Sequence, residues 1–447
     1  MGVTAARLGT APITVDWANV VRKFSPDSEV LNETWAQLKL RLQPQEIGFF
    51  DCPIQLELSQ INEAQSLADE ILRKNQFTDC LFLGIGGSAL GPISLLSSLQ
   101  EKQTSPIRFH FMENPDPVDW KSTVNKLKPQ STLVCSVTKS GTTFETMAQT
   151  LLALEWLGKE RWKSHMVIIT DPSRGDLRAF ANQEQIPTLS IAPSVGGRFS
   201  IFTPVGLFPA ALAGLSTQAF LAGAKQVRDY TERTPAEKNP LFILASELLG
   251  HYPKRSIHVC MPYSTRLKLF GTWFAKLWGE SLGKDGKGFT PLAAVGATDQ
   301  HSILQLLRDG PDDKITFFIT ADQVDDEVKI PKGPTTADRK VYPAFRILEG
   351  HTLQELLMIE QRAISLVLTK QSRPHVTLRV DRLDERSLGA LYFSFSLLTA
   401  FTGTLWGINP FDQPGVEEGK VYIKQALSQE PFQPEENTAV SRLRRDS

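Results

Sequence analysis

Two short stretches place hydroxyl groups and glycines where a predicted strand gives way to a helix. Residues 137–146, "VTKSGTTFET", carry five hydroxyl side chains, and Gly141 among them allows a ligand to approach the backbone closely. Residues 82–92, "FLGIGGSALGP", carry three glycines followed by Ser88. Hydroxyl donors at a helix N-terminus, where the backbone adds positive potential, suit a phosphate monoester without a metal. The alternative for each stretch is a capped turn with no ligand.

These two turns do not match the common nucleotide-binding fingerprints. The string G-I-G-G-S-A lacks the third glycine of GxGxxG, and the spacing GxxxxGK[ST] is absent. Both turns follow predicted strands, and the carboxyl ends of parallel strands share one edge of a sheet, where ligands bind. We therefore expect the two turns to meet at one phosphate-binding edge.

A second group of residues has the types that proton transfer needs. Arg198 follows two glycines in "SVGGRFSIFTPVG", and an arginine beside apolar sequence usually has a paired partner or a ligand. Glu280 follows an apolar helical pattern and precedes the glycine-rich "LGKDGKG", a junction where a partly desolvated carboxylate can serve as a base. The alternatives are a structural salt bridge for Arg198 and a solvated helix end for Glu280.

Two later motifs are less informative taken alone. Asp299 and His301 flank Gln300 at a predicted helix start, where a histidine is more often a cap or a core residue than a catalyst. "FDQPGVEEGK" contains Gln413 and Lys420, which an ordinary turn followed by a polar helix would also explain.

The elements that must position these residues alternate between strand and helix. Helical patterns such as 144–158 and 352–370 separate the apolar β-rich runs, which favours parallel sheets covered by helices on both faces. These runs lie near residues 79–84, 107–114, 131–138, 165–171, 256–264, 314–323 and 375–384.

The alternation stops and restarts, which predicts two α/β domains in tandem. We expect a helical N-terminal segment over residues 1–55, a first domain over 56–215 and a second over 216–405. Residues 406–447 are then a C-terminal segment that contributes to the active site. A chain of 447 residues is longer than one hydrophobic core usually serves.

Composition excludes several classes of protein. The net charge is −1 and no basic run is long enough to follow a nucleic-acid backbone, so no nucleic-acid partner is expected. The apolar run 388–408 contains serines, threonines and glycines, which favours a buried helix over a membrane span. The four cysteines form no CxxC pair, and the first residues lack a signal-peptide core, so we expect a cytoplasmic protein.

Taken together and in order, the motifs resemble those of the glucose-6-phosphate isomerase family in its bacterial type. The resemblance rests on "GIGGSALGP", "TKSGTTFET", "GGRFS", "GESLGK", "TDQHS" and "FDQPGVEEGK", which extend from residue 84 to residue 420. It implies two sugar-isomerase (SIS) domains, each a parallel sheet sandwiched by helices. It also implies reversible conversion of D-glucose 6-phosphate to D-fructose 6-phosphate in glycolysis and gluconeogenesis, with no metal or organic cofactor, by a homodimer.

The resemblance further implies a role for each matching residue. Glu280 resembles the base that moves a proton between C1 and C2 through a cis-enediol(ate), which Arg198 would stabilise. His301, reaching the site of the neighbouring subunit, and Lys420 resemble the groups that open the sugar ring, and Gln413 matches a substrate contact near the phosphate. The phosphate cradle matches Gly87, Ser88, Thr138, Ser140 and Thr143.

Two rival functions share this fold. One is a related aldose–ketose isomerase that also accepts mannose 6-phosphate. The other is a sugar-phosphate sensor, which would keep the hydroxyl turns but would not need Glu280, Arg198, His301 and Lys420 together.

Overall fold

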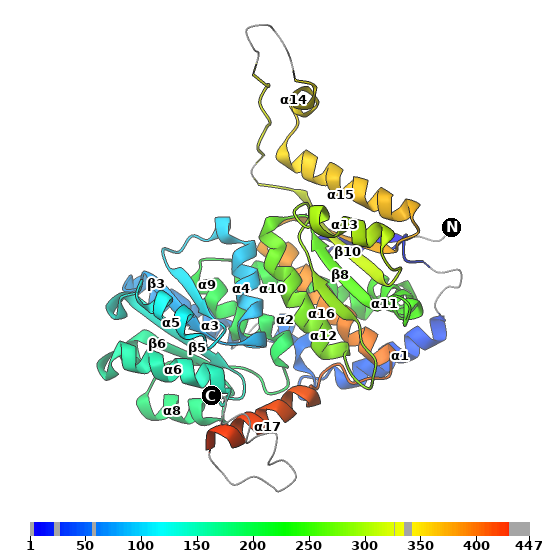
Figure 1. Ribbon diagram of the computed structural model, residues 1–447. Helices are drawn as coiled ribbons and strands as arrows, with labels where there is room; N and C mark the ends of the chain where they lie inside the picture. The colour runs from blue at the N-terminus through cyan, green and yellow to red at the C-terminus, as the bar shows by residue number, and fades with distance from the viewer. Residues whose placement is uncertain (1–3, 22–26, 56–59, 326, 335–341, 429–447) are drawn as a thin grey trace.

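Two β-sheets, each covered by helices, form the body of the protein (Figure 1). The computed structural model describes residues 4–428, except 22–26, 56–59, 326 and 335–341. The first sheet has the strand order β4-β3-β5-β6-β7 and is parallel throughout. Its strands are β3 (Asp79–Leu83), β4 (Arg108–Met112), β5 (Thr132–Thr138), β6 (Met166–Thr170) and β7 (Thr188–Ser190).

Burial on both faces explains the sequence of these strands. Every residue of β3, β5 and β6 is buried, as expected for continuous apolar strands between two helical layers. Phe82 packs toward α3 and α9, whereas its neighbour Leu83 packs toward α6 and α8. The helices of this half are α3 (Gln60–Lys74), α4 (Leu90–Ser98), α5 (Pro117–Val124), α6 (Phe144–Leu157), α7 (Trp162–His165), α8 (Asp176–Glu184) and α9 (Pro204–Leu212).

The second sheet contains the predicted run of parallel strands and adds an antiparallel edge that was not predicted. Its order is β1-β2-β11-β10-β8-β9, and the last four strands run parallel while β1 and β2 pair antiparallel at one edge. The four parallel strands are β8 (Ile257–Pro262), β9 (Thr290–Ala293), β10 (Lys314–Gln323) and β11 (His375–Arg382).

The N-terminal segment is therefore not wholly helical, and the prediction for residues 1–55 is wrong at its start. β1 (Ala5–Arg7) and β2 (Ile13–Asp16) precede the helices α1 (Ser28–Arg41) and α2 (Cys52–Gln55). The alternation of buried Ile13 and Val15 with half-buried neighbours is a strand signal, but it spans only four residues. The domain boundaries predicted at residues 55, 215 and 405 stay predictions.

Helix α16 (Glu385–Leu405) is the centre of the second core. It contacts α10, α11 and α12, and Figure 1 shows it among these helices. Judged by length and composition alone, it is long and apolar enough to cross a membrane. However, 89% of its apolar 18-residue stretch is buried inside the protein. The prediction of a buried helix over 388–408 is confirmed. The other helices of this half are α10 (Thr217–Arg233), α11 (Pro240–His251), α12 (Lys268–Leu282), α13 (Gln300–Asp309), α14 (Pro343–Leu348), α15 (Leu353–Lys370) and α17 (Pro414–Ser428).

Two glycines allow α10 and α16 to cross at backbone contact. A Cβ placed on Gly389 would lie 1.8 Å from the carbonyl oxygen of Phe220, and one on Gly223 would lie 1.8 Å from that of Arg386. No side chain fits at either position unless the helices move apart, so this crossing sets the distance between them.

Gly389→Ala tests this crossing. We expect the variant to lose about 3 kcal/mol or more of unfolding free energy, because overpacking a close backbone contact forces both helices to shift. Urea denaturation followed by circular dichroism measures the change. Gly419→Ala in α17 is the matched control, since a Cβ there meets nothing within 4 Å. Equal stability of the two variants would contradict the close crossing.

Candidate functional site

The two hydroxyl-bearing turns lie at the same edge of the first sheet. β3 and β5 are neighbours, with Leu83 opposite Ser136 in the parallel register. The short helix η2 (Gly86–Ser88) follows β3, and the turn 139–143 follows β5. The sequence prediction that these turns meet at one carboxyl edge is therefore confirmed.

The turn after β5 gathers its hydroxyls into one cluster. The Oγ1 atoms of Thr138 and Thr143 are 2.7 Å apart, and the Oγ of Ser140 lies 3.3 Å from that of Thr143. Thr143 occupies the N-cap position of α6, yet its side chain makes no capping hydrogen bond. The cluster is thus not explained as a helix cap, which favours the phosphate interpretation. Gly141 has φ +67°, a left-handed conformation that glycine adopts without strain.

The turn after β3 presses against the glycines before Arg198. A Cβ on Gly87 would lie 2.4 Å from the carbonyl carbon of Gly197 and 2.8 Å from the amide nitrogen of Arg198. Ser200 supports the contact, because its hydroxyl donates to the carbonyl oxygens of Gly197 (2.7 Å) and Gly87 (3.3 Å). Ser88 is half-buried, and helix α4 that follows it has no side-chain cap.

Arg198 is buried and almost fully engaged by the protein. Its Nε donates to the hydroxyl of Ser281 at 2.7 Å, and its Nη1 donates to Oε1 of Gln413 at 3.2 Å. Its Nη2 donates to the backbone carbonyls of Pro410 and Asp412. A guanidinium has five N–H donors, so these contacts hold the group rigidly and make it a fixed positive charge. Burial lowers the pKa of Arg198, and the nearby carboxylates Glu280 and Asp412 oppose that shift.

Glu280 lies between two cations. Its Oε1 is 3.7 Å from Nη1 of Arg198, and its Oε2 is 2.9 Å from Nζ of Lys276, with the side chain of Glu280 only 13% exposed. Oε2 is buried and makes no aligned hydrogen bond, so its contact with Lys276 is one of charge. Glu280 is therefore not at a solvated helix end. For Arg198 the alternative of a purely structural salt bridge is excluded only in part, because most of its donors bind the protein itself.

The start of the C-terminal segment closes over this cluster. Lys284 Nζ donates to the carbonyl oxygens of Ser281 (3.0 Å) and Asn409 (2.6 Å) and lies 3.2 Å from Oδ1 of Asp412. Burial lowers the pKa of Lys284, and its hydrogen bond to Asp412 opposes that shift. With the bonds that Arg198 makes, these contacts tie residues 409–413 to the end of α12.

Lys139 was not predicted as a site residue, but the structure places it beside this edge. Its Nζ donates to the carbonyl oxygen of Pro193 at 2.7 Å, and burial lowers its pKa, with the charge of Arg198 adding to the effect and Asp171 opposing it. Lys276 and Lys284 were also missed. Lysines are common on helix surfaces and in turns, so their types and spacing carry no signal of this burial.

The two residues predicted to open the sugar ring lie on different helices. His301 is exposed on α13, and within the described part of the chain no hydrogen bond or ion pair links its side chain to Glu280 or Arg198. Lys420 is half-buried in α17, about two helical turns beyond Gln413. Across the residues that the structure describes, no group of three or more His, Cys, Asp or Glu side chains is arranged to hold a metal ion.

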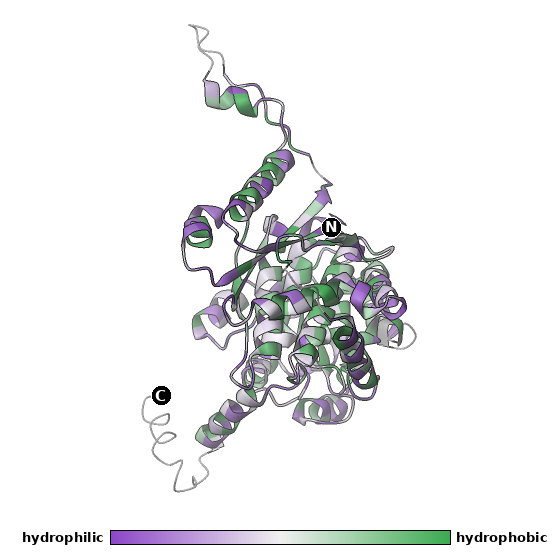
Figure 2. Cartoon of the chain, turned by 90° about the vertical axis from the view of Figure 1, so that its right-hand side faces the viewer, coloured by the Kyte–Doolittle hydropathy of each residue, from purple (hydrophilic) through white to green (hydrophobic). Residues whose placement is uncertain are grey.

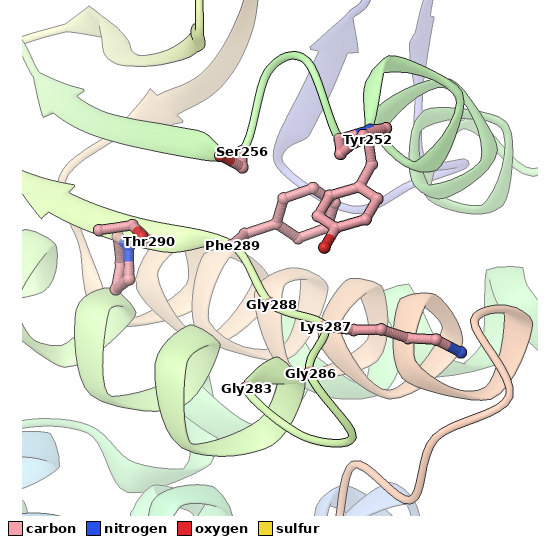
Figure 3. Close-up of a pocket in the computed structure, with 10 residues that line it drawn as sticks. Tyr252, Ser256, Gly283, Gly286, Lys287, Gly288, Phe289 and Thr290 are labelled. Carbon is pink, nitrogen blue, oxygen red and sulfur yellow. The ribbon is translucent and has the colours of Figure 1, made fainter.

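A cavity of about 500 Å³ lies beside the loop 283–288 but outside the Arg198 cluster. Figure 3 shows the rings of Tyr252 and Phe289 close together at this cavity and Lys287 pointing away from them. Lys287 Nζ donates to the carbonyl oxygen of Trp406 at 3.0 Å, which fixes the loop to the end of α16. None of the ten lining residues is a predicted site residue, so this cavity is a neighbour of the candidate site.

Comparison with known proteins shows which family this chain resembles. The sequence model of the family described as phosphoglucose isomerase matches residues 71–441. A glucose-6-phosphate isomerase of Rubrobacter xylanophilus is 41% identical over 370 residues, which cover 80% of this chain and 84% of that protein. One of Carboxydothermus hydrogenoformans is 36% identical over 425 residues, covering 91% and 90%. The crystal structure of a glucose-6-phosphate isomerase from Chlamydia trachomatis shares the fold, with a TM-score of 0.79, 24% identity and coverage of 97% and 91%.

The contact between Gly87 and Gly197 can be tested from both sides. We expect Gly87→Ala to lose about 1–3 kcal/mol of unfolding free energy, because the new methyl group would force two turns apart. Gly197→Ala is the control, since a Cβ added there would meet no atom closer than the Cα of Gly87, at the ordinary contact distance of 3.9 Å. Urea unfolding and calorimetric titration with inorganic phosphate compare the two variants. If both behave as the parent protein does, the turns are not in close contact.

Proposed function

Because the chain belongs to the phosphoglucose isomerase family, we propose that it interconverts D-glucose 6-phosphate and D-fructose 6-phosphate, a step shared by glycolysis and gluconeogenesis. The observation that carries the proposal is the placement of Glu280. This carboxylate lies beside the fixed guanidinium of Arg198, and the backbone amide of Arg198 is pressed against the turn after β3. The residue proposed as the base, the cation and one of the turns proposed to bind phosphate therefore come together from separate parts of the chain.

The phosphate group would bind at the edge of the first sheet. The residues proposed to hold it are small, lie at or after the ends of strands β3 and β5, and offer either a hydroxyl group or an accessible backbone amide. They are Gly87, Ser88, Thr138, Ser140 and Thr143. Gln413, which already accepts a hydrogen bond from Arg198, would face the substrate next to this cradle. Fixing the phosphate holds the far end of the open-chain sugar, with C1 and C2, in one orientation relative to Glu280. The reacting atoms then no longer have to find each other by diffusion.

Proton transfer would then take place between C1 and C2. The Glu280 carboxylate takes the proton from C2 of the aldose, and a cis-enediol(ate) forms as its electrons move toward the carbonyl oxygen. A proton passes from O2 to O1 of the enediol(ate), Glu280 returns its proton to C1 as the carbonyl forms at C2, and the ketose results. Arg198 would stabilise the negative charge on the enediolate oxygens, because a cation held in place before the reaction favours the transition state over the substrate.

Ring opening would come first, through His301 and Lys420. We propose that His301 acts in the active site of a second copy of the chain, so that the enzyme is a homodimer. In support, His301 is exposed on α13, and among the described residues it makes no hydrogen bond or ion pair with Glu280 or Arg198. An arm built from residues 327–334 and 342–352 also stands away from the body in Figure 2 and exposes apolar side chains. These are Val328, Tyr342, Phe345 and Ile347.

We further propose a cytoplasmic location. All four cysteines are free and buried, and burial raises the pKa of the thiols of Cys52, Cys80, Cys135 and Cys260. Cysteines used as small apolar side chains fit a reducing compartment.

Glu280→Gln tests the proposed base. We expect turnover of glucose 6-phosphate to fall by about 10²–10⁴-fold, because the amide cannot accept the C2 proton, while the affinity for glucitol 6-phosphate changes little. A coupled assay measures the turnover, and calorimetry measures the affinity for glucitol 6-phosphate. In a separate experiment with the parent enzyme, isomerisation in deuterated water should label C2 of the recovered glucose 6-phosphate. Glu70→Gln is the control, since this exposed glutamate also pairs with a lysine one helical turn away. Full activity of Glu280→Gln would show that Glu280 is not the base. Separately, if the parent enzyme turned over mannose 6-phosphate as fast as glucose 6-phosphate, its substrate range would be broader than proposed.

Mixing two inactive variants tests the dimer. Glu280→Gln and His301→Ala should each be inactive, yet refolding them together should restore about one quarter of the parent activity, because half of the dimers are mixed and each has one intact site. Glu280→Gln mixed with the double variant should stay inactive. No recovery in the first mixture would place His301 in its own subunit's site, whereas full activity of His301→Ala alone would place His301 outside the chemistry.

A further inference from the structure

Lys276 is the cation nearest to the proposed base, and neither the motifs nor the resemblance assigns it a role. It lies on α12, four residues before Glu280, so the two side chains share one helix face. Its Nζ is 2.9 Å from Oε2 of Glu280, with side-chain exposures of 28% and 13%. An ion pair this far from open water is less screened than a surface pair.

Helix stability does not explain this pair. A lysine that precedes a glutamate by four residues is the less favourable order on a helix, because each charge then opposes the helix dipole. The exposed pair Glu70–Lys74 has the favourable order. The reason for the Lys276–Glu280 pair must therefore lie in the site itself.

Lys276 also touches the turn that follows β3. A Cβ placed on Gly86 would lie 3.1 Å from both Cε and Nζ of Lys276, so the end of this side chain lies over the glycine turn. Gly86 has φ +60°, and the next residue, Gly87, is the one pressed against Gly197. Lys276 thus joins a carboxylate on a helix of the second half to the phosphate-binding turn of the first half.

The two oxygens of Glu280 are held by different partners. Arg198 lies 3.7 Å from Oε1 and is itself fixed by Ser281 and Gln413. Among the described residues, Lys276 makes no hydrogen bond or ion pair other than its contact with Oε2 of Glu280. Without Lys276, the carboxylate would keep one cation and could rotate about the end of its side chain, because terminal carboxylate torsions are broad.

We propose that Lys276 is a positioning residue: its ammonium fixes Oε2 of Glu280 against the Gly86 turn, so that the base stands at a set distance from a sugar anchored by its phosphate. This inference rests on the proposed function. It assigns Lys276 no contact with the substrate and no proton to carry. Its contribution is orientation, which affects the proton-transfer step more than binding.

Lys276→Met provides the test, since methionine keeps most of the length and removes the charge. We expect kcat to fall about 10- to 100-fold, in line with a base displaced by about 1 Å, while KM and the affinity for glucitol 6-phosphate change less than about threefold. Lys276→Arg, which returns a cation to Oε2, should recover much of kcat. Lys268→Met, at the exposed start of the same helix, is the control and should match the parent enzyme. Thermal unfolding checks that each variant is folded, and Lys276→Gln replaces the methionine variant if that variant is not.

A double variant separates positioning from an independent role. In the Glu280→Gln background, Lys276→Met should cause no further loss, because a residue that acts through Glu280 has nothing left to position. A raised KM with unchanged kcat would make Lys276 a substrate-binding residue, and additive losses would make it independent of Glu280; either result overturns the inference. Failure of the inference is distinguishable from failure of the proposed function. An absence of glucose 6-phosphate turnover by the parent enzyme would reject the function, whereas an inactive Glu280→Gln beside a fully active Lys276→Met would reject only the role of Lys276.

Discussion

The buried guanidinium of Arg198 is the constraint on which the site depends. A charge taken out of water costs several kcal/mol unless hydrogen bonds and opposite charge replace its hydration. Here the replacements come from two parts of the chain: Ser281 and Glu280 at the end of α12, and the segment 410–413, through the backbone carbonyls of 410 and 412 and the side chain of Gln413. Meeting the needs of one side chain therefore fixes these two segments relative to the one that carries Arg198.

The same residue links the two halves of the protein, because its side chain binds the end of α12 while its backbone contacts the first half. Its amide lies against Gly87, where the absence of a side chain allows the turn after β3 to touch the turn before Arg198. Close packing of backbone atoms leaves little freedom in this contact, so the position of the turn after β3 is fixed relative to Arg198. Between the two halves, α4 packs on both α9 and α12, which extends the same rigid arrangement away from the site.

The strands were predictable where an apolar, β-rich run extended over five residues or more. Seven apolar runs, among them 131–138 and 314–323, correspond to strands of the two sheets, because continuous β-rich segments have few other ways to bury themselves. Four strands were not predicted, and these have three or four residues each: β1, β2, β7 and β9. Strands this short contain too few positions for a periodic signal, and their pairing depends on neighbours distant in sequence.

The chain itself determined which chemical groups are present and in what local setting. Hydroxyls beside Gly141 at a strand end and a glutamate before a glycine-rich loop are properties of adjacent residues, so they can be recognised without coordinates. The tertiary structure decided which lysines matter. Lys139, Lys276 and Lys284 look like surface residues in sequence, yet the fold places each beside a carbonyl or carboxylate and removes most of its water. Electrostatic roles depend on distance and burial, and both quantities are set only when segments remote in sequence pack together.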